Sequence, residues 1–201
     1  NLALKKKCKF VICNFKFKKN LKQETIKYFF YKNREDLHNM CKIFYNFNNF
    51  KIIFVTGTNG KTSIAYGAYK LFNMNGINSC YIGTLGFFIK SKKIKKLNNT
   101  TPSYFEILNL LQKVNGDHIK FVFMEVSSIG YCEGRIGDLL YDYCILTNLE
   151  SDHLDYHKNL KNYHLAKLNL IKRHQVKKSI LFLQDDNLKI KFKYFNNNLF
   201  T

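Results

Sequence analysis

The stretch VTGTNGKTS, from Val55 to Ser63, decides the fold of this chain. It follows the apolar run 52–55, which is typical of a buried strand, and it precedes a segment, 64–72, with apolar residues at helical spacing. A glycine loop between a strand and a helix can aim backbone N–H groups at a phosphate, and the helix N-terminus adds the positive end of its dipole. The sequence therefore predicts a phosphate-binding loop, and a bare glycine turn is the simpler alternative.

The residues that follow Gly60 favour the phosphate loop over the simple turn. Lys61 would reach the outer phosphates of ATP as a point charge, and the Thr62 hydroxyl can ligate Mg²⁺. The strict P-loop pattern has a glycine where this chain has Val55, so the loop is a variant of that pattern. We expect it to bind ATP.

The composition of the chain is strongly basic. Its 201 residues carry a formal net charge of +19, with a pI of about 9.6. Such a charge is compatible with an anionic partner such as nucleic acid or a nucleotide. However, lysine recurs throughout together with Asn, Ile, Phe and Tyr, and the basic residues form no single stripe, so we favour compositional drift in an AT-rich genome over nucleic-acid binding.

The chain has no stretch of about twenty apolar residues, so no membrane span is expected. Its six cysteines show neither a CxxC pair nor zinc-finger spacing to histidine, and several fall in apolar runs. This pattern predicts buried free thiols in a reducing cytoplasm.

The pattern along the chain predicts an α/β fold with a mostly parallel sheet and flanking helices. Residues 1–49 form a poorly specified, reduced N-terminal segment, and residues 50–201 form the regular domain. The expected helices cover 34–44, about 61–75, a segment from 102 onward and about 159–172. The expected strands are 51–55, 80–82, 121–126, 141–148 and 180–183, and the basic segment 90–99 is expected to be a solvated, flexible loop.

Polar residues gather where the expected strands end, which is where open parallel sheets bind their ligands. Glu125 ends one strand beside the loop and is surrounded by apolar residues, so it needs a nearby cation or polar partner. The partner would be the Mg²⁺ of the nucleotide or, alternatively, a lysine. The run DHLDYH, 152–157, is either a metal-ligand cluster or a helix-capping loop with surface histidines.

These segments together resemble the central domain of the Mur ligase family, and within it the MurE type. The resemblance rests on VTGTNGKTS, NTTPS (99–103), MEVSS followed by GR (124–135), TNLESDHLDYH (147–157) and the helix that contains Ala166 and Lys167. The segments occur in the family's order over about residues 50–172. The related folylpolyglutamate synthases share the loop and fold but lack the NTT and DHLDYH patterns.

The resemblance implies a role for each matching residue. Those expected to contact the ATP phosphates are Gly57, Thr58, Asn59, Gly60, Lys61, Thr62 and Ser63. Those expected to contact a UDP-muramoyl-dipeptide are Asn99, Thr100, Thr101, Ser127 and Arg135. The catalytic set would be Lys61, Glu125, His153 and Lys167, and the magnesium ligands would be Thr62, Glu125, His153 and Lys167. Lys167 would act in carbamylated form, although without the resemblance it is one lysine among many.

The implied reaction is an ATP-dependent amide ligation in peptidoglycan precursor synthesis. The dipeptide's γ-carboxylate would form an acyl phosphate, which the amine of a diamino acid, meso-diaminopimelate or L-lysine, would then attack. Two positions depart from the family pattern, with Ile129 where His is usual and Glu133 where Gln is expected. The C-terminal ligase domain, which binds the incoming amino acid, lies outside the sequence.

Three interpretations remain open from the sequence. The first is a MurE-type ligase whose missing domain belongs to the same polypeptide or to a second chain. The second is a degenerate fragment that retains nucleotide binding only. The third is a basic P-loop protein that binds nucleic acid.

Overall fold

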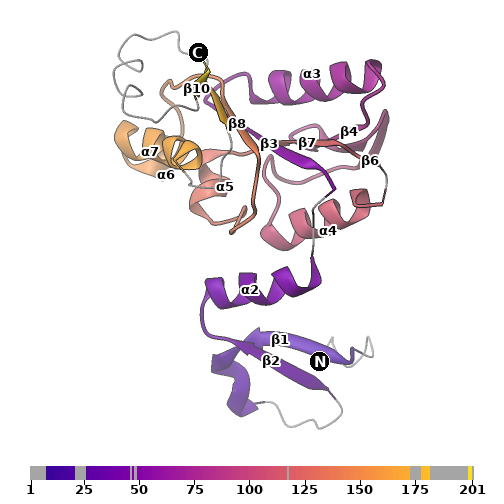
Figure 1. The fold of residues 1–201 in the computed structure, drawn as a ribbon. Coiled ribbons are helices and arrows are strands. Elements are labelled where there is room, and N and C mark those ends of the chain that lie inside the picture. Colours follow the sequence, from indigo (N-terminus) through magenta and orange to yellow (C-terminus); the bar gives the residue numbers. More distant parts are fainter. Residues whose placement is uncertain are drawn as a thin grey trace. The chain divides into compact units, whose positions relative to one another are not determined.

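The computed structural model describes residues 8–20, 26–45, 47, 49–116, 118–172, 178–181 and 199–200. The chain divides into two compact units, Asn1–Asn46 and Phe47–Thr201 (Figure 1). None of the described helices combines the length and apolar character that a bilayer span requires. The cysteines are free thiols, and Cys80 and Cys144 are buried in strands as expected.

The N-terminal unit contains more regular structure than the sequence suggests. Strands β1 (Phe10–Asn14) and β2 (Lys27–Tyr31) pair in parallel, with the 3-10 helix η1 (Phe15–Asn20) between them. Helix α2 (Arg34–Phe44) has the expected bounds, and the Asn33 side chain caps it by accepting a hydrogen bond from the Asp36 N–H. The two strands were not predicted because their sequences, FVICN and KYFFY, show no clean alternation of apolar and polar residues.

The second unit is built on an eight-stranded sheet, whose described strands have the order β10-β9-β8-β3-β7-β4-β5-β6. All neighbours are parallel except β4–β5 and β5–β6, which confirms a mostly parallel sheet. The strands are β3 (Lys51–Thr56), β4 (Ser79–Gly83), β5 (Gly86–Ile89), β6 (Lys92–Lys95), β7 (Phe121–Glu125), β8 (Tyr143–Leu146), β9 (Lys178–Leu181) and β10 (Leu199–Phe200).

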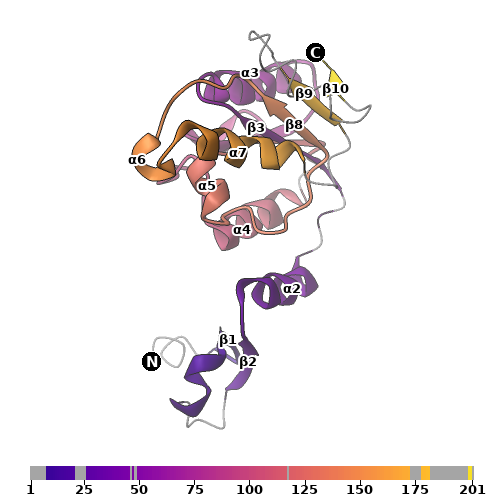
Figure 2. The same ribbon diagram turned by 90° about the vertical axis from the view of Figure 1, so that its left-hand side faces the viewer.

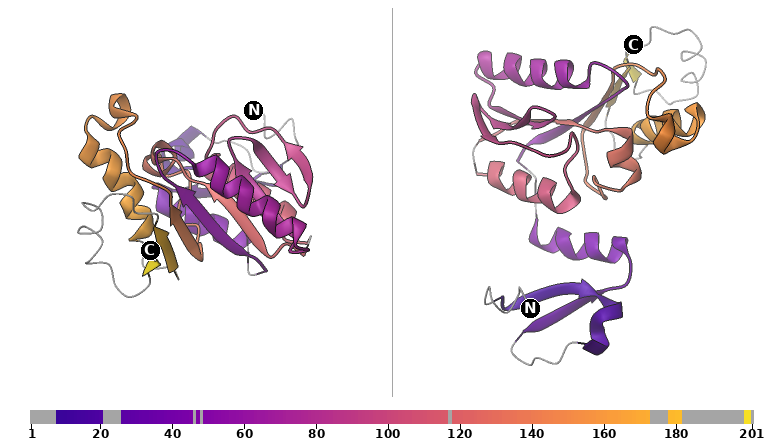
Figure 3. Two further views of the ribbon diagram at one scale, coloured as in Figure 1. Left: turned by 90° about the horizontal axis from the view of Figure 1, so that it is seen from above. Right: turned by 180° about the vertical axis from the view of Figure 1, so that it is seen from behind.

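Helices cover both faces of this sheet (Figure 1). Helix α3 lies across β3, β7 and β4 on one face, as Figure 3 shows from above. On the other face lies α4, and α7 packs against α5 and α6 (Figure 2). The bounds are α3 (Lys61–Met74), α4 (Tyr104–Val114), α5 (Ser128–Cys132), α6 (Leu154–His157) and α7 (Leu160–Ile171).

The alternation of side chains along β3 explains why helices cover both faces of the sheet. Ile52 and Phe54 belong to the larger core cluster, which contains residues of α4 and α7. Ile53 and Val55 point to the opposite face and pack with Ala65 and the residues around it on α3. Because both faces of the strand are buried, its sequence is apolar throughout.

One expectation about the domain is wrong. The basic segment 90–99 is not simply a flexible loop, because Lys92–Lys95 forms β6 at the edge of the sheet, paired antiparallel with β5. All four β6 residues are exposed. An edge strand needs no apolar face, and exposed lysines protect such an edge from pairing with another chain, so hydrophobic periodicity could not reveal it.

The order of the central strands positions the candidate site. β3 lies between β7 and β8, in parallel with both, and Val55 is in register with Glu125. The carboxyl ends of these three strands therefore meet at one edge of the sheet, as expected for a ligand site in this class of fold.

Candidate active site

The phosphate loop joins β3 to α3 and depends on two glycines. Gly57 has φ +148° and Gly60 has φ +76°, conformations that a residue with a Cβ rarely adopts. A Cβ on Gly57 would also lie 1.8 Å from Thr147 Oγ1, so the loop can approach β8 this closely only with glycine. Helix α3 begins at Lys61, directly after the loop.

Lys61 is folded back over the loop. Its Nζ donates to the carbonyl oxygens of Gly57 at 2.9 Å and Thr58 at 2.8 Å. Burial lowers the pKa of Lys61, while the charges of Glu125 and Asp152 oppose that shift. An ammonium held by two neutral carbonyls is available for exchange onto a more negative acceptor such as a phosphate.

Glu125 is fully buried, and its partners are hydroxyls and a backbone N–H (the donors are Tyr81 Oη, Thr84 N, Thr84 Oγ1 and Thr62 Oγ1). No lysine donates a hydrogen bond to it within the part of the chain described, so the alternative of a lysine salt bridge is not supported. The Thr62 hydroxyl, from the start of α3, donates to Glu125 Oε2 at 2.8 Å. The hydroxyl and carboxylate expected to share a Mg²⁺ are thus direct neighbours.

The Thr62 hydroxyl and the Glu125 carboxylate are groups that can bind a magnesium ion. Both donors are oxygens, the atoms that Mg²⁺ prefers, and in nucleotide sites the ion completes its shell with phosphates and water. Among the described residues, no group of three or more His, Cys, Asp and Glu side chains forms a metal site by itself. The Thr62 and Glu125 oxygens suit a Mg²⁺ ion whose other ligands are phosphates and water.

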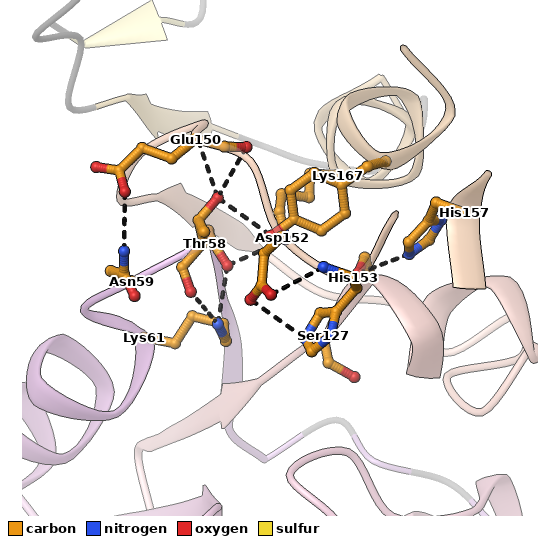
Figure 4. A network of polar contacts seen from close by, with 12 residues as sticks. Thr58, Asn59, Lys61, Ser127, Glu150, Asp152, His153, His157 and Lys167 are labelled. Carbon is orange, nitrogen blue, oxygen red and sulfur yellow. Dashed lines mark hydrogen bonds and ion pairs between the residues drawn. The ribbon is translucent and has the colours of Figure 1, made fainter. Parts of the chain in front are cut away.

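The two histidines of DHLDYH have different environments. His153 is exposed, has φ +50°, and its Nε2 lies 3.4 Å from Asp152 Oδ2 (Figure 4). His157 is buried, with Nε2 3.0 Å from Ser128 Oγ, and its pKa is lowered by burial and then by the charge of Lys167. Of the two, His153 is the one accessible to a ligand, and its place as a magnesium ligand stays a prediction.

Lys167 is buried, with only 1% of its surface exposed, so it is not one more surface lysine. Its Nζ donates to Gly57 O at 3.1 Å and lies 4.0 Å from the centre of the Tyr163 ring. Burial and then the charge of Lys61 lower its pKa to about 7, against the opposing effect of Asp152. α7 thus presents to the phosphate loop a buried amine whose pKa is well below that of an ordinary lysine.

Most of the residues predicted to contact the dipeptide gather around Thr101. Thr101 Oγ1 accepts from the Ser127 N–H at 2.9 Å, and Arg135 Nη1 donates to Thr101 O at 2.9 Å. Thr100 Oγ1 lies 3.0 Å from Thr84 Oγ1, and Thr84 in turn contacts Glu125. Asn99 is exposed near the start of the same segment. The structure thus links this cluster to the buried carboxylate.

Glu133 is an ion-pair partner of Arg135. Its Oε2 lies 2.5 Å from Arg135 Nη2 and 2.7 Å from Arg135 Nε. The guanidinium of Arg135 therefore balances the negative charge of Glu133. Ile129, the other departure, is half-buried in α5.

Sequence reasoning missed several partners of these residues. Tyr81 and Thr84 hold Glu125, Asn148 holds the phosphate loop, and Tyr163 contacts Thr58 and Lys167. From the sequence, Tyr81 is indistinguishable from an ordinary core aromatic residue, because Glu125, which accepts from its hydroxyl, lies 44 residues away. Only Asn148 gave a usable signal, because it stands at the end of the expected strand 141–148.

These features define an α/β protein with a glycine loop between β3 and α3. The model of the Mur ligase middle domain matches residues 55–201, which is most of the chain, and the chain belongs to this family. The expected family is thus confirmed, as is the fold.

Comparison with individual proteins gives the same relationship. The chain is 37% identical over 201 residues to the UDP-N-acetylmuramoyl-L-alanyl-D-glutamate–2,6-diaminopimelate ligase of Buchnera aphidicola subsp. Acyrthosiphon pisum, covering 95% of this chain and 40% of that protein. It is 41% identical over 137 residues to the ligase of the same name from Fusobacterium nucleatum subsp. nucleatum, covering 68% and 28% respectively. The chain thus spans well under half the length of these relatives.

Solved structures share the fold. A structure of a UDP-N-acetylmuramoyl-L-alanyl-D-glutamate–2,6-diaminopimelate ligase superposes with a TM-score of 0.69 at 24% identity, over 89% of this chain and 37% of that one. The bifunctional folylpolyglutamate/dihydrofolate synthase of Yersinia pestis, complexed with AMPPNP and Mn ion, gives 0.60 at 14% identity, over 83% and 46%.

Proposed function

We propose that this chain supplies the ATP-binding and acyl-activating part of a MurE-type ligase. That enzyme would add a diamino acid to UDP-N-acetylmuramoyl-L-alanyl-D-glutamate. The main support is that Lys61, Thr62, Glu125 and Lys167 lie together at the carboxyl ends of the central strands. The chain that carries them belongs to the Mur ligase family. The relatives' names favour diaminopimelate over lysine as the diamino acid.

In this proposal the phosphate loop and Lys61 hold the triphosphate. Lys61 exchanges its two carbonyl partners for phosphate oxygens and balances the charge that develops on the transferred group. Mg²⁺, held by Thr62 and Glu125 with His153 as a further ligand, would supply Lewis-acid stabilisation of the same phosphate oxygens. Tyr81 and Thr84 keep the Glu125 carboxylate oriented toward Thr62.

The dipeptide substrate would lie across the Thr101 cluster (Asn99, Thr100, Thr101, Ser127 and Arg135). Hydroxyls and a guanidinium suit an anionic acceptor, and the cluster's link through Thr84 to Glu125 supports placing the γ-carboxylate near the γ-phosphate. Attack there forms the acyl phosphate and releases ADP, and attack by the amine releases phosphate. Holding both reactants in place would supply much of the rate.

Lys167 would act as a carbamate. Its neutral amine attacks the carbon of CO₂, a C–N bond forms, one C=O pair moves to oxygen, and the nitrogen loses a proton to water. A pKa lowered to about 7 leaves enough neutral amine for this step near neutral pH. The product is an anion beside the phosphate loop that can hold a second Mg²⁺.

The remaining ligase domain would come from further residues of the same polypeptide or from a second chain. We also infer a cytoplasmic location, since the described cysteines are free. The test is ATP hydrolysis or ligation with the dipeptide precursor and diaminopimelate, with the C-terminal domain of a relative added. Turnover that depends on the precursor supports the proposal. Binding of MgATP without turnover supports the nucleotide-binding fragment, and salt-sensitive nucleic-acid binding tighter than nucleotide binding supports the third interpretation.

A further inference from the structure

The side chain of Asn148 binds the backbone of the phosphate loop at three points. Asn148 Oδ1 accepts from the N–H groups of Thr58 at 3.0 Å and Asn59 at 2.9 Å. Asn148 Nδ2 also lies 3.3 Å from Asn59 O, to which it donates. One amide side chain from the segment after β8 thus satisfies two donors and one acceptor of the loop.

Neighbours of Asn148 reinforce the same connection. The Thr147 hydroxyl donates to Asn59 O at 2.5 Å, and the Glu150 N–H donates to Thr58 Oγ1 at 3.0 Å. The Asn59 side chain donates to Glu150 Oε2 at 2.9 Å (Figure 4). The conformation of residues 57–59 is therefore set largely by the segment 147–150.

This connection divides the N–H groups of the loop into two sets. The Asn59 N–H points to the side-chain oxygen of Asn148, and the Thr58 N–H points to that oxygen and, at 3.3 Å, to the backbone carbonyl of Asn148. The first helical hydrogen bond of α3 runs from Ile64 N to Gly60 O, so the N–H groups of 61–63 have no acceptor within the helix. Those are the groups left at the helix N-terminus for an anion.

We propose that Asn148 is a positioning residue for nucleotide binding. It holds residues 57–59 in the conformation that aims Lys61 and the N-terminus of α3 at the phosphates, without touching the nucleotide itself. Without this side chain, the Asn59 N–H would lose its acceptor and the Thr58 N–H would keep only the backbone carbonyl of residue 148, so the triphosphate would have to order the loop on binding. This inference rests on the proposed binding of ATP.

The test compares Asn148→Ala with two other variants. Asn148→Asp keeps an acceptor for both N–H groups but adds a negative charge. Asn75→Ala removes a comparable side-chain hydrogen bond, Asn75 Nδ2 to Leu71 O at 2.8 Å, at the far end of α3. It therefore controls for a general loss of helix stability.

The first readout is amide hydrogen exchange by NMR in the nucleotide-free protein. The Asn59 amide should exchange much faster in Asn148→Ala than in the wild-type chain or in Asn148→Asp. The Thr58 amide keeps the Asn148 carbonyl as an acceptor and should change less, while the Phe54 and Val55 amides of β3 stay unchanged. A wild-type exchange rate at Asn59 in Asn148→Ala would overturn the proposal. This readout needs no nucleotide, so it remains informative if the chain does not bind ATP.

The second readout is the affinity for MgATP by calorimetry. Asn148→Ala should weaken it about tenfold, as expected for the loss of one or two loop-ordering hydrogen bonds, and Asn75→Ala should leave it unchanged. Equal affinity of Asn148→Ala and wild type would contradict the positioning role, as would equal weakening in both alanine variants. If the wild-type chain itself shows no binding, the proposed function fails, and the exchange data alone decide the role of Asn148.

Discussion

Lys61 and Lys167 donate hydrogen bonds to the same atom, the carbonyl oxygen of Gly57, at 2.9 and 3.1 Å. Two ammonium groups that share one acceptor oxygen repel each other. Accordingly, the charge of Lys61 is the second cause of the lowered pKa of Lys167. The phosphate loop and α7 are therefore coupled electrostatically, because Lys61 and Lys167 share a single carbonyl oxygen.

The stability of the chain should depend on pH through Lys167. Its pKa is about 7 in the folded chain and returns toward the ordinary 10.5 on unfolding, so between these values the unfolded chain binds more protons. The free energy of unfolding should therefore rise with pH across this window. Lys167→Met should flatten that rise in urea titrations without CO₂. The exposed Lys161→Met on the same helix is the control, and an unchanged slope in Lys167→Met would argue against a depressed pKa.

The same amine should react with CO₂. In the presence of ¹³C-labelled bicarbonate, the wild-type chain should give a protein-bound carbamate signal in ¹³C NMR, and Lys167→Met should not. In a complete ligase, short carboxylates should restore activity to Lys167→Ala. A signal that persists in Lys167→Met would assign the carbamate to another amine.

Gly57 and Gly67 should respond oppositely to alanine. Gly57→Ala forces a Cβ into Thr147 at a φ of +148°, so it should destabilise the chain by several kcal/mol or displace the loop and abolish nucleotide binding. Gly67 lies within α3 with no heavy atom within 4 Å of an added Cβ, so Gly67→Ala should stabilise by about 0.5–1 kcal/mol. Denaturant unfolding and MgATP titration measure both, and a Gly57→Ala chain that behaves like Gly67→Ala would refute the steric argument.

The Thr62–Glu125 contact predicts a magnesium-specific defect. Thr62→Val removes the hydroxyl but preserves the shape of the side chain, so it should weaken the binding of MgATP about tenfold or more and leave the binding of ATP in EDTA nearly unchanged. Thr62→Ser retains the hydroxyl and should behave like the wild type. Equal weakening with and without Mg²⁺ would mean that Thr62 contacts the phosphates only.

Glu133 should limit the affinity of the Thr101 cluster for anions. Glu133→Gln frees Arg135 from its ion pair, so the affinity for the UDP-muramoyl-dipeptide should rise, while stability should change by less than about 1 kcal/mol because the pair is partly exposed. Glu106→Gln, which breaks the similarly exposed pair with Lys95, is the matched control. Calorimetry that shows equal affinities in Glu133→Gln and wild type would remove Arg135 from the binding site.

The parts of this fold that the sequence predicts are those with strong local signals. The strand–loop–helix around Gly60 and the helix 34–44 are examples, because glycine punctuation and apolar periodicity are local properties. Strand β6 was missed since an exposed edge strand of lysines has no apolar face. The expected strand 180–183 overlaps β9, and residues 182–183 lie outside the described residues.

The candidate site was predictable as a set of residues but not as a geometry. Glu125 was correctly expected to need a polar partner, yet Tyr81 and Thr84 could not be named, because pairing of β4 with β7 brings them there. The burial of Lys167 was likewise unpredictable, since α7 also carries Lys161 and only tertiary packing distinguishes the two.

The central claim is that the loop from Gly57 to Ser63 binds the phosphates of ATP, and the most direct measurement is calorimetric titration of the chain with MgATP, compared with Lys61→Ala. We expect saturable binding by the wild-type chain that Lys61→Ala loses or weakens at least about a hundredfold, because a charge-assisted contact to phosphate disappears. Binding of equal strength in Lys61→Ala and wild type would contradict the assignment of this loop.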